Sequence, residues 1–298
     1  ARESLQSGVG LPGPWLFVQA MGRLFTGDVV EGRQLCAEAE AQLAEFDPLG
    51  VAPQAHGIRA LFESMAGNKE TAESLAELVR KDPRGAPTRS AVWVDRAAAW
   101  NVAAGGEPER AADLAVKTGE AAVAGTHYVW GAFAHHDAVR FGHPDKAVEP
   151  LRALAEEGRG PLVGLLADHA IAASAGDRGA LLGVALRCQQ SGAHALVSEC
   201  HAAAAMLTTG VEQRRHAHLA WLVHDRCIGF KSPLVRLVDP PLSKRQLEIA
   251  SLASAGNSSK DIAHQLHISA RTVDNHLRTV YRIFGIDSRS ALAELFPG

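Results

Sequence analysis

Apolar, Ala-rich stretches fill most of the chain, and short turn signals interrupt them at regular distances. Each signal contains a glycine, the residue that most readily ends a helix and begins a turn. The signals are Gly27-Asp28, Gly67-Asn68, Gly105-Gly106, Gly142-His143-Pro144 and Gly176-Asp177. Successive signals lie roughly 33 to 40 residues apart, a period typical of helical-hairpin repeats.

One stretch illustrates the pattern within a repeat. Leu75, Leu78 and Val79, together with Ala72 and Ala76, form an apolar stripe. A single helix pair cannot bury such a stripe, so its neighbour must cover it. We therefore predict a stack of helical hairpins similar to tetratricopeptide units, although the consensus of a named repeat is not clearly present. Further helices are expected at 193–207 and 211–227.

A break in the helical pattern follows at residues 228–241. Gly229, Pro233 and the Pro240-Pro241 pair exclude a continuous helix there. We predict a helical-repeat domain at 1–227, a linker at 228–241 and a second domain at 242–298. The alternative is a buried loop within one large helical domain.

The segment after this break divides into short helices with recognisable starts. Ser243 with Gln246 three residues later predicts a capping box, and the helix that begins there ends at Gly256. Ser258 with Asp261 begins a second helix in the same way. We therefore expect two short, separately capped helices.

Two more helices follow. Ser269 caps the third helix, at 269–284, and Gly285 ends it. Apolar residues recur in it at three- and four-residue steps, namely Val273, Leu277, Val280, Tyr281 and Phe284. The fourth helix begins near Ser288.

The connection between the second and third helices is the short turn that a helix-turn-helix requires. It lies around His267-Ile268, with Ala263 small where the two helices approach each other. Here the sequence resembles the LuxR-type (GerE-like) DNA-binding module. The resemblance rests on Glu248 and on the runs AGNSSKDIA (255–263), ISARTVDNHL (268–277) and FGIDSRSALA (284–293). It covers about a fifth of the chain and implies a DNA-binding transcription regulator.

The resemblance implies roles for individual residues. The third helix would be the recognition helix, with its N-terminal half in the major groove. The side chains nearest the base edges would be Thr272, Val273, Asn275 and His276, with Arg271 and Arg278 reaching bases or phosphates. The residues that anchor the DNA backbone would be Ser259, Lys260 and Thr272. Many members carry Lys where this chain has Asp274.

The fourth helix resembles the element through which family members dimerise on DNA, with Leu292 and Leu295 as contact residues.

The residues by themselves allow simpler interpretations. Val273, Leu277 and Val280 fit a helix core, and Glu248 fits a salt bridge or a cap. The polar positions of the third helix fit any exposed helix face.

The architecture resembles one group within this family. Large ATP-binding regulators similar to the maltose-operon activator place a P-loop ATPase first, a helical-repeat sensor next and this module last. The present chain resembles the last two parts, and the sequence leaves open whether an ATPase part precedes Ala1. We expect the repeats to sense a small-molecule or protein effector, and the protein to bind double-stranded DNA as a homodimer. RNA polymerase is a further candidate partner.

Composition favours a helical protein, and its modest charge asymmetry does not by itself identify a nucleic-acid binder. Aromatic residues are few and Ala and Leu dominate, which favours an all-α fold. The formal charge is -3 overall, but the segment from Leu242 onward carries seven Lys or Arg against five Asp or Glu. No cysteine pairing pattern, apolar stretch of about 18 residues or secretion signal is present. We therefore expect a cytoplasmic protein that does not enter a membrane.

Catalytic and metal-binding patterns are weak. The chain has no GxxxxGK[ST], GxSxG or HExxH motif. The pairs His135-His136 and Cys200-His201, and His216 with His218, diverge on a helix and do not form a chelate. We expect no catalysis, cofactor or metal.

The alternative function is a protein-interaction adaptor in which the terminal helices serve as a cap or a dimer contact.

Overall fold

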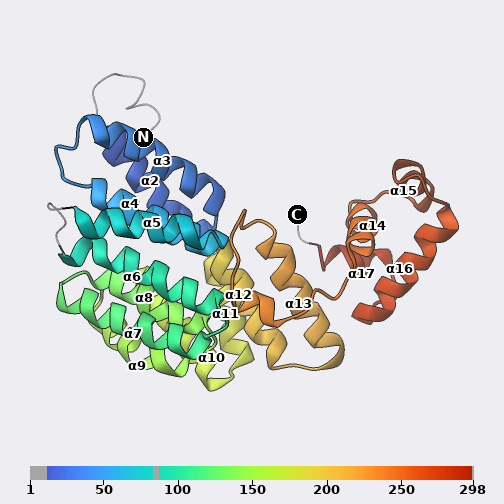
Figure 1. The fold of residues 1–298 in the computed structure, drawn as a ribbon. Coiled ribbons are helices and arrows are strands. Elements are labelled where there is room, and N and C mark those ends of the chain that lie inside the picture. Colours follow the sequence, from blue (N-terminus) through green and yellow to red (C-terminus); the bar gives the residue numbers. More distant parts are fainter. Residues whose placement is uncertain (1–11, 83–86, 297–298) are drawn as a thin grey trace.

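The computed structural model describes residues 12–82 and 87–296, where it contains sixteen α-helices, one short 3₁₀ helix and no strand. The predicted all-α class is confirmed. The first twelve helices form six hairpins stacked into a curved array, and the last four form a separate unit at one end (Figure 1). None of the helices in these two ranges has the length and apolar character needed to span a membrane.

Each hairpin pairs two consecutive helices. The hairpins are α2 (Pro12–Thr26) with α3 (Val29–Glu45), α4 (Ala52–Ala66) with α5 (Lys69–Lys81), α6 (Pro87–Ala104) with α7 (Pro108–Ala124), α8 (Tyr128–Arg140) with α9 (Asp145–Glu156), α10 (Pro161–Ala175) with α11 (Arg178–Gln190), and α12 (His194–Met206) with α13 (Gly210–His224). We call α14 (Lys244–Ser254), α15 (Ser259–Gln265), α16 (Ala270–Phe284) and α17 (Arg289–Ala293) the C-terminal unit.

All five turn signals identified in the sequence lie within hairpins. Gly67 and Gly176 end α4 and α10 with φ of 85° and 64°, in the left-handed region where a side chain is disfavoured. The sixth hairpin turns between Met206 and Gly210, and no Gly-Asp or Gly-Asn pair marks it. The repeat period therefore follows from where helices end.

The stripe on α5 differs from the expectation at one position. Ala72, Leu75, Ala76 and Val79 are buried, but Leu78 is 54% exposed. Successive helical residues are rotated by about 100°, which places Leu78 roughly 120° away from the centre of the stripe formed by the other four. Leu78 is therefore a surface residue and not part of the packing against α6.

The array curves so far that α2 of the first hairpin contacts α12 of the last, and the first hairpin also contacts α8 and the segment after α13. The amides of Val29 and Val30 donate to the carbonyl of Ile228 at 2.9 and 3.2 Å. Phe25 on α2 packs edge-on against Phe133 on α8, with ring centroids 5.1 Å apart. Because the ends meet, the inner helices enclose a core instead of lining an open groove.

A buried ionic network crosses that core. Arg96 on α6 donates to Asp137 on α8 at 2.7 Å, and Arg140 bridges Asp137 at 3.2 Å and Glu199 on α12 at 3.0 Å. Ser232 donates to the same Glu199 carboxylate at 3.0 Å. All five residues are buried, so three hairpins and the segment after α13 are joined by charges that cannot be hydrated.

We call residues 228–241, the predicted linker, the strap. It contains no α-helix, only the 3₁₀ helix η1 (Val235–Leu237), in agreement with its prolines and glycine. Its residues are nevertheless packed against the array, because Lys231 N donates to Met65 O at 3.2 Å and Trp221 Nε1 donates to Val238 O at 2.8 Å. Phe230 is also buried.

The ionic network predicts a large destabilisation when one carboxylate is lost. Asp137→Ala leaves Arg96 buried without an acidic partner, and we expect a loss of about 3–5 kcal/mol in unfolding free energy. The matched control is Asp113→Ala, which breaks the solvent-exposed pair with Lys146 and costs less than about 1 kcal/mol. All five tryptophans precede the strap, so urea unfolding followed by tryptophan fluorescence reports on the array. Equal, small losses in both variants would contradict this account.

Candidate nucleic-acid interface

Serine caps set the helix starts of the C-terminal unit. Ser243 and Ser258 each form the predicted capping box, with side chain and backbone bonded reciprocally. The Ser269 hydroxyl accepts from the backbone N–H of Thr272 at 3.0 Å, and Ser288 caps α17. These caps satisfy helix-end N–H groups, so four short helices begin at defined residues.

The turn between α15 and α16 is compact, as predicted. His267 has φ of 53°, an unusual left-handed conformation for a residue other than glycine. The amide of Ile268 donates to the carbonyl of Ala263 at 3.0 Å, which closes the end of α15. Ala263 is buried between the two helices. The pair therefore has the compact geometry of a helix-turn-helix.

Three residues expected at interfaces lie inside the unit. Val273 and Leu292 are 0% exposed and Leu295 is 8% exposed. All three pack in one core with residues such as Ile249 and Phe284. A unit of four helices offers few apolar side chains, and its core uses nearly all of them. We therefore assign Val273 to the core instead of to base contact, and Leu292 and Leu295 to the core instead of to a dimer contact.

Helix α16 has two opposite faces. Val273, Leu277, Val280 and Phe284 are buried on one face. The residues exposed on the other face are Arg271, Asp274, Asn275, Arg278 and Arg282. At about 100° per residue, these five side chains fall within roughly 60° of Arg271 on the helix circumference, and the buried face lies opposite. We call this exposed set the polar stripe.

Basic side chains on and near the polar stripe have no internal partner. Arg271, Arg278 and Arg282 are exposed, and no hydrogen bond or ion pair engages their side chains within residues 12–82 and 87–296. Lys260, at the start of α15, is likewise exposed and unpaired there. Four cations are therefore available to an external anion.

Two other arginines serve the structure. Arg245 pairs with Glu248 at 2.7 Å and donates to the carbonyl of Leu266 at 2.9 Å, at the end of α15. Arg289 donates to the carbonyl of Asn257, before α15. The Glu248 salt bridge agrees with the simpler interpretation of that residue. Arg245 and Arg289 fix both ends of α15, so they are poorly placed to meet phosphates.

Ser259 and Asp274 are joined across the two helices. The Ser259 hydroxyl donates to a carboxylate oxygen of Asp274 at 2.7 Å, and Arg289 donates to the same hydroxyl at 3.3 Å. The Ser259 hydroxyl is thus occupied. Asp274 remains exposed at one edge of the polar stripe, where it contributes the one negative charge.

Thr272 and His276 lie on the flank of α16. Both are half-buried, at about 100° and 140° around the helix from Arg271. The Thr272 hydroxyl is hydrogen bonded to Ser269 at 2.7 Å. Of the predicted recognition residues, Arg271, Asn275 and Arg278 therefore share the stripe, whereas Thr272 and His276 border it.

The C-terminal unit rests on the sixth hairpin, a contact that the sequence analysis missed. Arg214 and Arg215 on α13 donate to the carbonyls of Ile283 and Phe284 at 2.7 and 3.0 Å. These carbonyls lie at the C-terminal end of α16, where positive charge is favourable. Nothing in the local pattern of α13 marks these arginines, because their partners lie 69 residues away.

His218 completes this contact. It is buried, donates from Nε2 to the carbonyl of Leu295 at 3.0 Å, and lies between the rings of Phe284 and Phe296 at 5.1 and 4.6 Å. Burial lowers the pKa of His218 to about 4, against the opposing effect of the hydrogen bond to Leu295. The neutral ring therefore joins α13 to the end of the unit.

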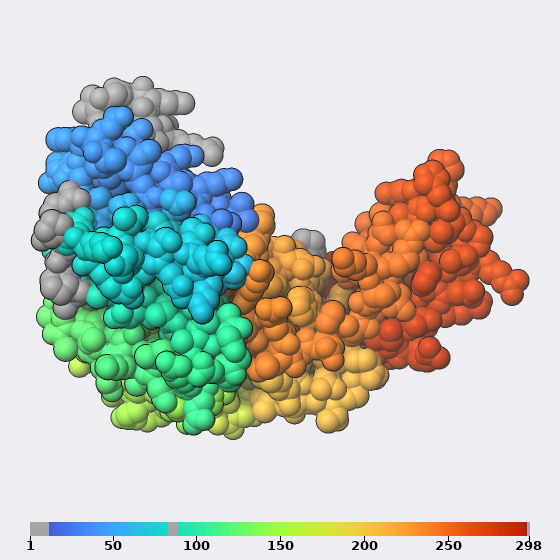
Figure 2. Space-filling view, viewed as in Figure 1, coloured from blue at the N-terminus to red at the C-terminus, as the bar shows by residue number. Residues whose placement is uncertain are grey.

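One end of the C-terminal unit contacts the array, and the opposite end lies away from it (Figure 1). α15 and the N-terminal half of α16 lie far from the hairpins, and the C-terminal end of α16 meets α13 (Figure 1). The space-filling view shows the unit projecting from the sixth hairpin, with open space between it and the first hairpin (Figure 2). The polar stripe thus begins at the end of the molecule that the array does not cover.

Residues 240–296 match the family described as bacterial regulatory proteins, luxR family. The match confirms the resemblance and identifies the C-terminal unit as a luxR-family helix-turn-helix domain. That domain, in an all-helical chain, indicates a DNA-binding transcription regulator. No match was found among the curated proteins or among the solved structures.

The single carboxylate in the polar stripe predicts a gain of affinity when it is neutralised. Asp274→Asn removes repulsion between that carboxylate and DNA phosphates, and we expect about three- to fivefold tighter binding to a random duplex at ~0.1 M salt. Fluorescence anisotropy with a labelled duplex measures this. Glu156→Gln, the same charge change at an exposed residue of α9 in the array, is the control and should change binding little. If both variants gained equally, the stripe would not be the DNA-facing surface.

Proposed function

We propose that the protein regulates transcription by inserting the N-terminal half of α16 into the major groove of DNA. The observation that carries this proposal is the polar stripe, where Arg271, Asn275 and Arg278 are exposed and face away from the core. A major groove about 12 Å wide accepts one α-helix, so a stripe on a single face is what base edges would meet.

The roles follow from the chemistry of each side chain. Asn275 offers an amide donor and acceptor, the pair that reads adenine, and Arg278 offers a fork that suits guanine or phosphate. Lys260 at the start of α15 supplies a phosphate contact, and Arg271 supplies another. Asp274 disfavours phosphate and favours a base edge that donates, such as the amino group of cytosine.

We further propose that two copies bind together. One small unit makes few contacts, whereas a dimer doubles the phosphate contacts and reads two half-sites about 34 Å apart. Because Leu292 and Leu295 serve the core, the dimer contact would use the exposed surface of α17, where Ser290, Ala293 and Glu294 lie. Leu295 and Phe296, next to that surface, contact His218 of the array.

The closeness of the proposed dimer surface to α13 suggests how the array would control dimerisation. While Arg214, Arg215 and His218 hold the unit against α13, the sixth hairpin stands beside the surface that a second copy would need. An effector on the array that loosens this contact would free the surface. The array would thus act as a sensor for a small molecule or a protein, with DNA affinity as its output.

The recognition role predicts a loss of sequence preference in one variant. Asn275→Ala should weaken binding to a duplex selected from a random pool by about 5- to 150-fold, because a bidentate base contact contributes about 1–3 kcal/mol. The affinity of this variant for an unselected duplex should stay within twofold of that of the unsubstituted protein. His276→Ala is the comparison, and its effect should be smaller because His276 lies on the flank. Unchanged preference in Asn275→Ala, measured by competition gel shift, would contradict the proposed role of α16.

The sensor role predicts a gain of function when the contact with α13 is broken. Arg214→Ala with Arg215→Ala removes two charged hydrogen bonds to α16, each contributing about 1.5–3 kcal/mol. We expect a larger dimer fraction in sedimentation and at least tenfold tighter binding to a duplex with two half-sites. Gln213→Ala, on the exposed side of α13, is the control. An Arg214/Arg215 variant that matches this control in both measurements would rule out control through α13.

A further inference from the structure

A hollow of about 690 Å³ lies where the ends of three hairpins meet the strap. Its walls come from the ends of α4, α6 and α8 and from residues 231–237. Orange atoms of the strap meet cyan and green atoms of the hairpins along this seam (Figure 2). The volume is within the range of small-molecule sites, about 300–1,000 Å³.

One side of the hollow is apolar. Trp100 is 2% exposed and packs against Phe141 and Phe230, with ring centroids 5.5 and 5.6 Å away. Met65 and Leu237 extend this wall, and Leu237 is 62% exposed. The indole N–H of Trp100 is buried and has no acceptor among the residues that the structure describes. Leu237, Ala104 and Pro108 are the exposed apolar residues of the lining, and an apolar ring or chain would find its contact area there.

The other side carries unpaired positive charge. Lys231 and Arg236 line the hollow, and no ion pair or side-chain hydrogen bond engages either of them in the described chain. The hollow is lined by no Asp or Glu. Arg140 also borders it, but Glu199 and Asp137 neutralise that guanidinium. The local field therefore favours an anion.

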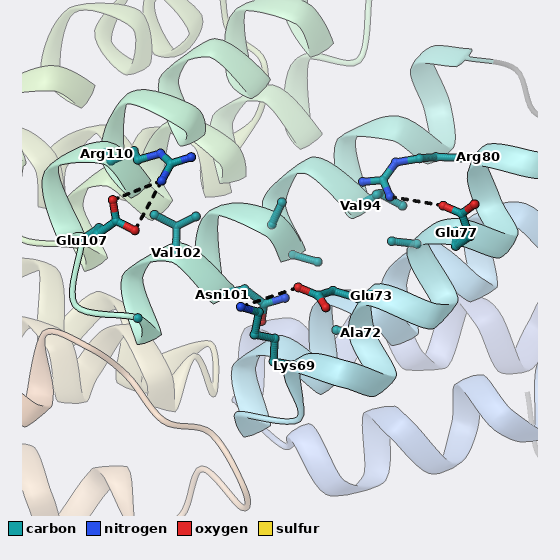
Figure 3. Close-up of a pocket in the computed structure, with 14 residues that line it drawn as sticks. Lys69, Ala72, Glu73, Glu77, Arg80, Val94, Asn101, Val102, Glu107 and Arg110 are labelled. Carbon is teal, nitrogen blue, oxygen red and sulfur yellow. Dashed lines mark hydrogen bonds and ion pairs between the residues drawn. The ribbon is translucent and has the colours of Figure 1, made fainter.

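A second hollow, between α5, α6 and α7, differs from the first because its charged side chains are paired (Figure 3). Its charges cancel in neighbouring pairs, Lys69 with Glu73 at 3.8 Å and Arg110 with Glu107 at 3.1 Å. Arg80 likewise meets Glu77 at 4.0 Å. That hollow, although of similar volume at about 600 Å³, offers no net charge to a ligand.

We infer that the hollow beside the strap binds a small organic anion, a carboxylate attached to an apolar ring or chain. The apolar part would lie against Leu237 and Ala104, and the carboxylate would meet Lys231 and Arg236. This inference rests on the proposed sensing function and names its ligand class. The strap ends two residues before α14, so a ligand that draws these two cations inward would act on the segment that leads to the DNA-binding unit.

Isothermal titration of the full chain with two matched probes tests the inference. 1-Naphthaleneacetate carries the carboxylate, and 1-naphthaleneacetamide has nearly the same shape without the charge. We expect the acid to bind at least tenfold more tightly than the amide. The double variant Lys231→Gln, Arg236→Gln should reduce acid binding by about tenfold, to the level of the amide, because exposed charge pairs contribute up to about 1 kcal/mol each.

The matched control is Lys69→Gln with Arg80→Gln, which removes two cations from the second hollow and should leave acid binding unchanged. All four substituted side chains are exposed, and circular dichroism checks that each variant is folded. Equal affinity for acid and amide, no binding of either, or acid binding that survives the loss of Lys231 and Arg236 would overturn the inference. Titration without DNA keeps this result separate from the DNA-binding function, which the selected duplex tests.

Discussion

The burial of one face of α16 fixes what its other face can do. Val273, Leu277, Val280 and Phe284 complete the small core of the C-terminal unit, and no rotation of the helix keeps all four buried except the one observed. The same rotation turns Arg271, Asn275 and Arg278 outward as a single row. Stability therefore uses one side of the helix, and the proposed recognition would use the other.

The array and the unit are coupled through ordinary contacts at two places. The α13 residues Arg214, Arg215 and His218 hold the C-terminal end of α16. The strap joins the buried ionic network through Ser232 and ends two residues before α14. Phe230, Ser232, Leu234, Val235 and Val238 of the strap are buried, so the strap is attached to the array at several points. The unit contacts the array at the C-terminal end of α16, and α15 with the start of α16 lies away from the array (Figure 1).

Local signals in the sequence predicted the fold well. Glycine turns located five hairpins, and serine caps located the helices of the unit, because both depend on neighbouring residues. The sequence could not reveal contacts between residues that are far apart along the chain. His136 and His169, hydrogen bonded at 2.9 Å in the core, and Arg214 with Ile283 come together only after the hairpins stack. The sequence alone did not separate core residues from interface residues among the apolar positions of the C-terminal unit. Val273, Leu292 and Leu295 are buried in its core.

The central claim is that α16 reads the major groove, and guanine N7 atoms lie only in that groove. The most direct measurement is dimethyl sulfate protection of a duplex selected by the full chain from a random pool. The account predicts protected guanines in two half-sites about one helical turn apart, with protection lost in the Asn275→Ala, Arg278→Ala double variant. Unprotected guanine N7 throughout a duplex that is bound would contradict it.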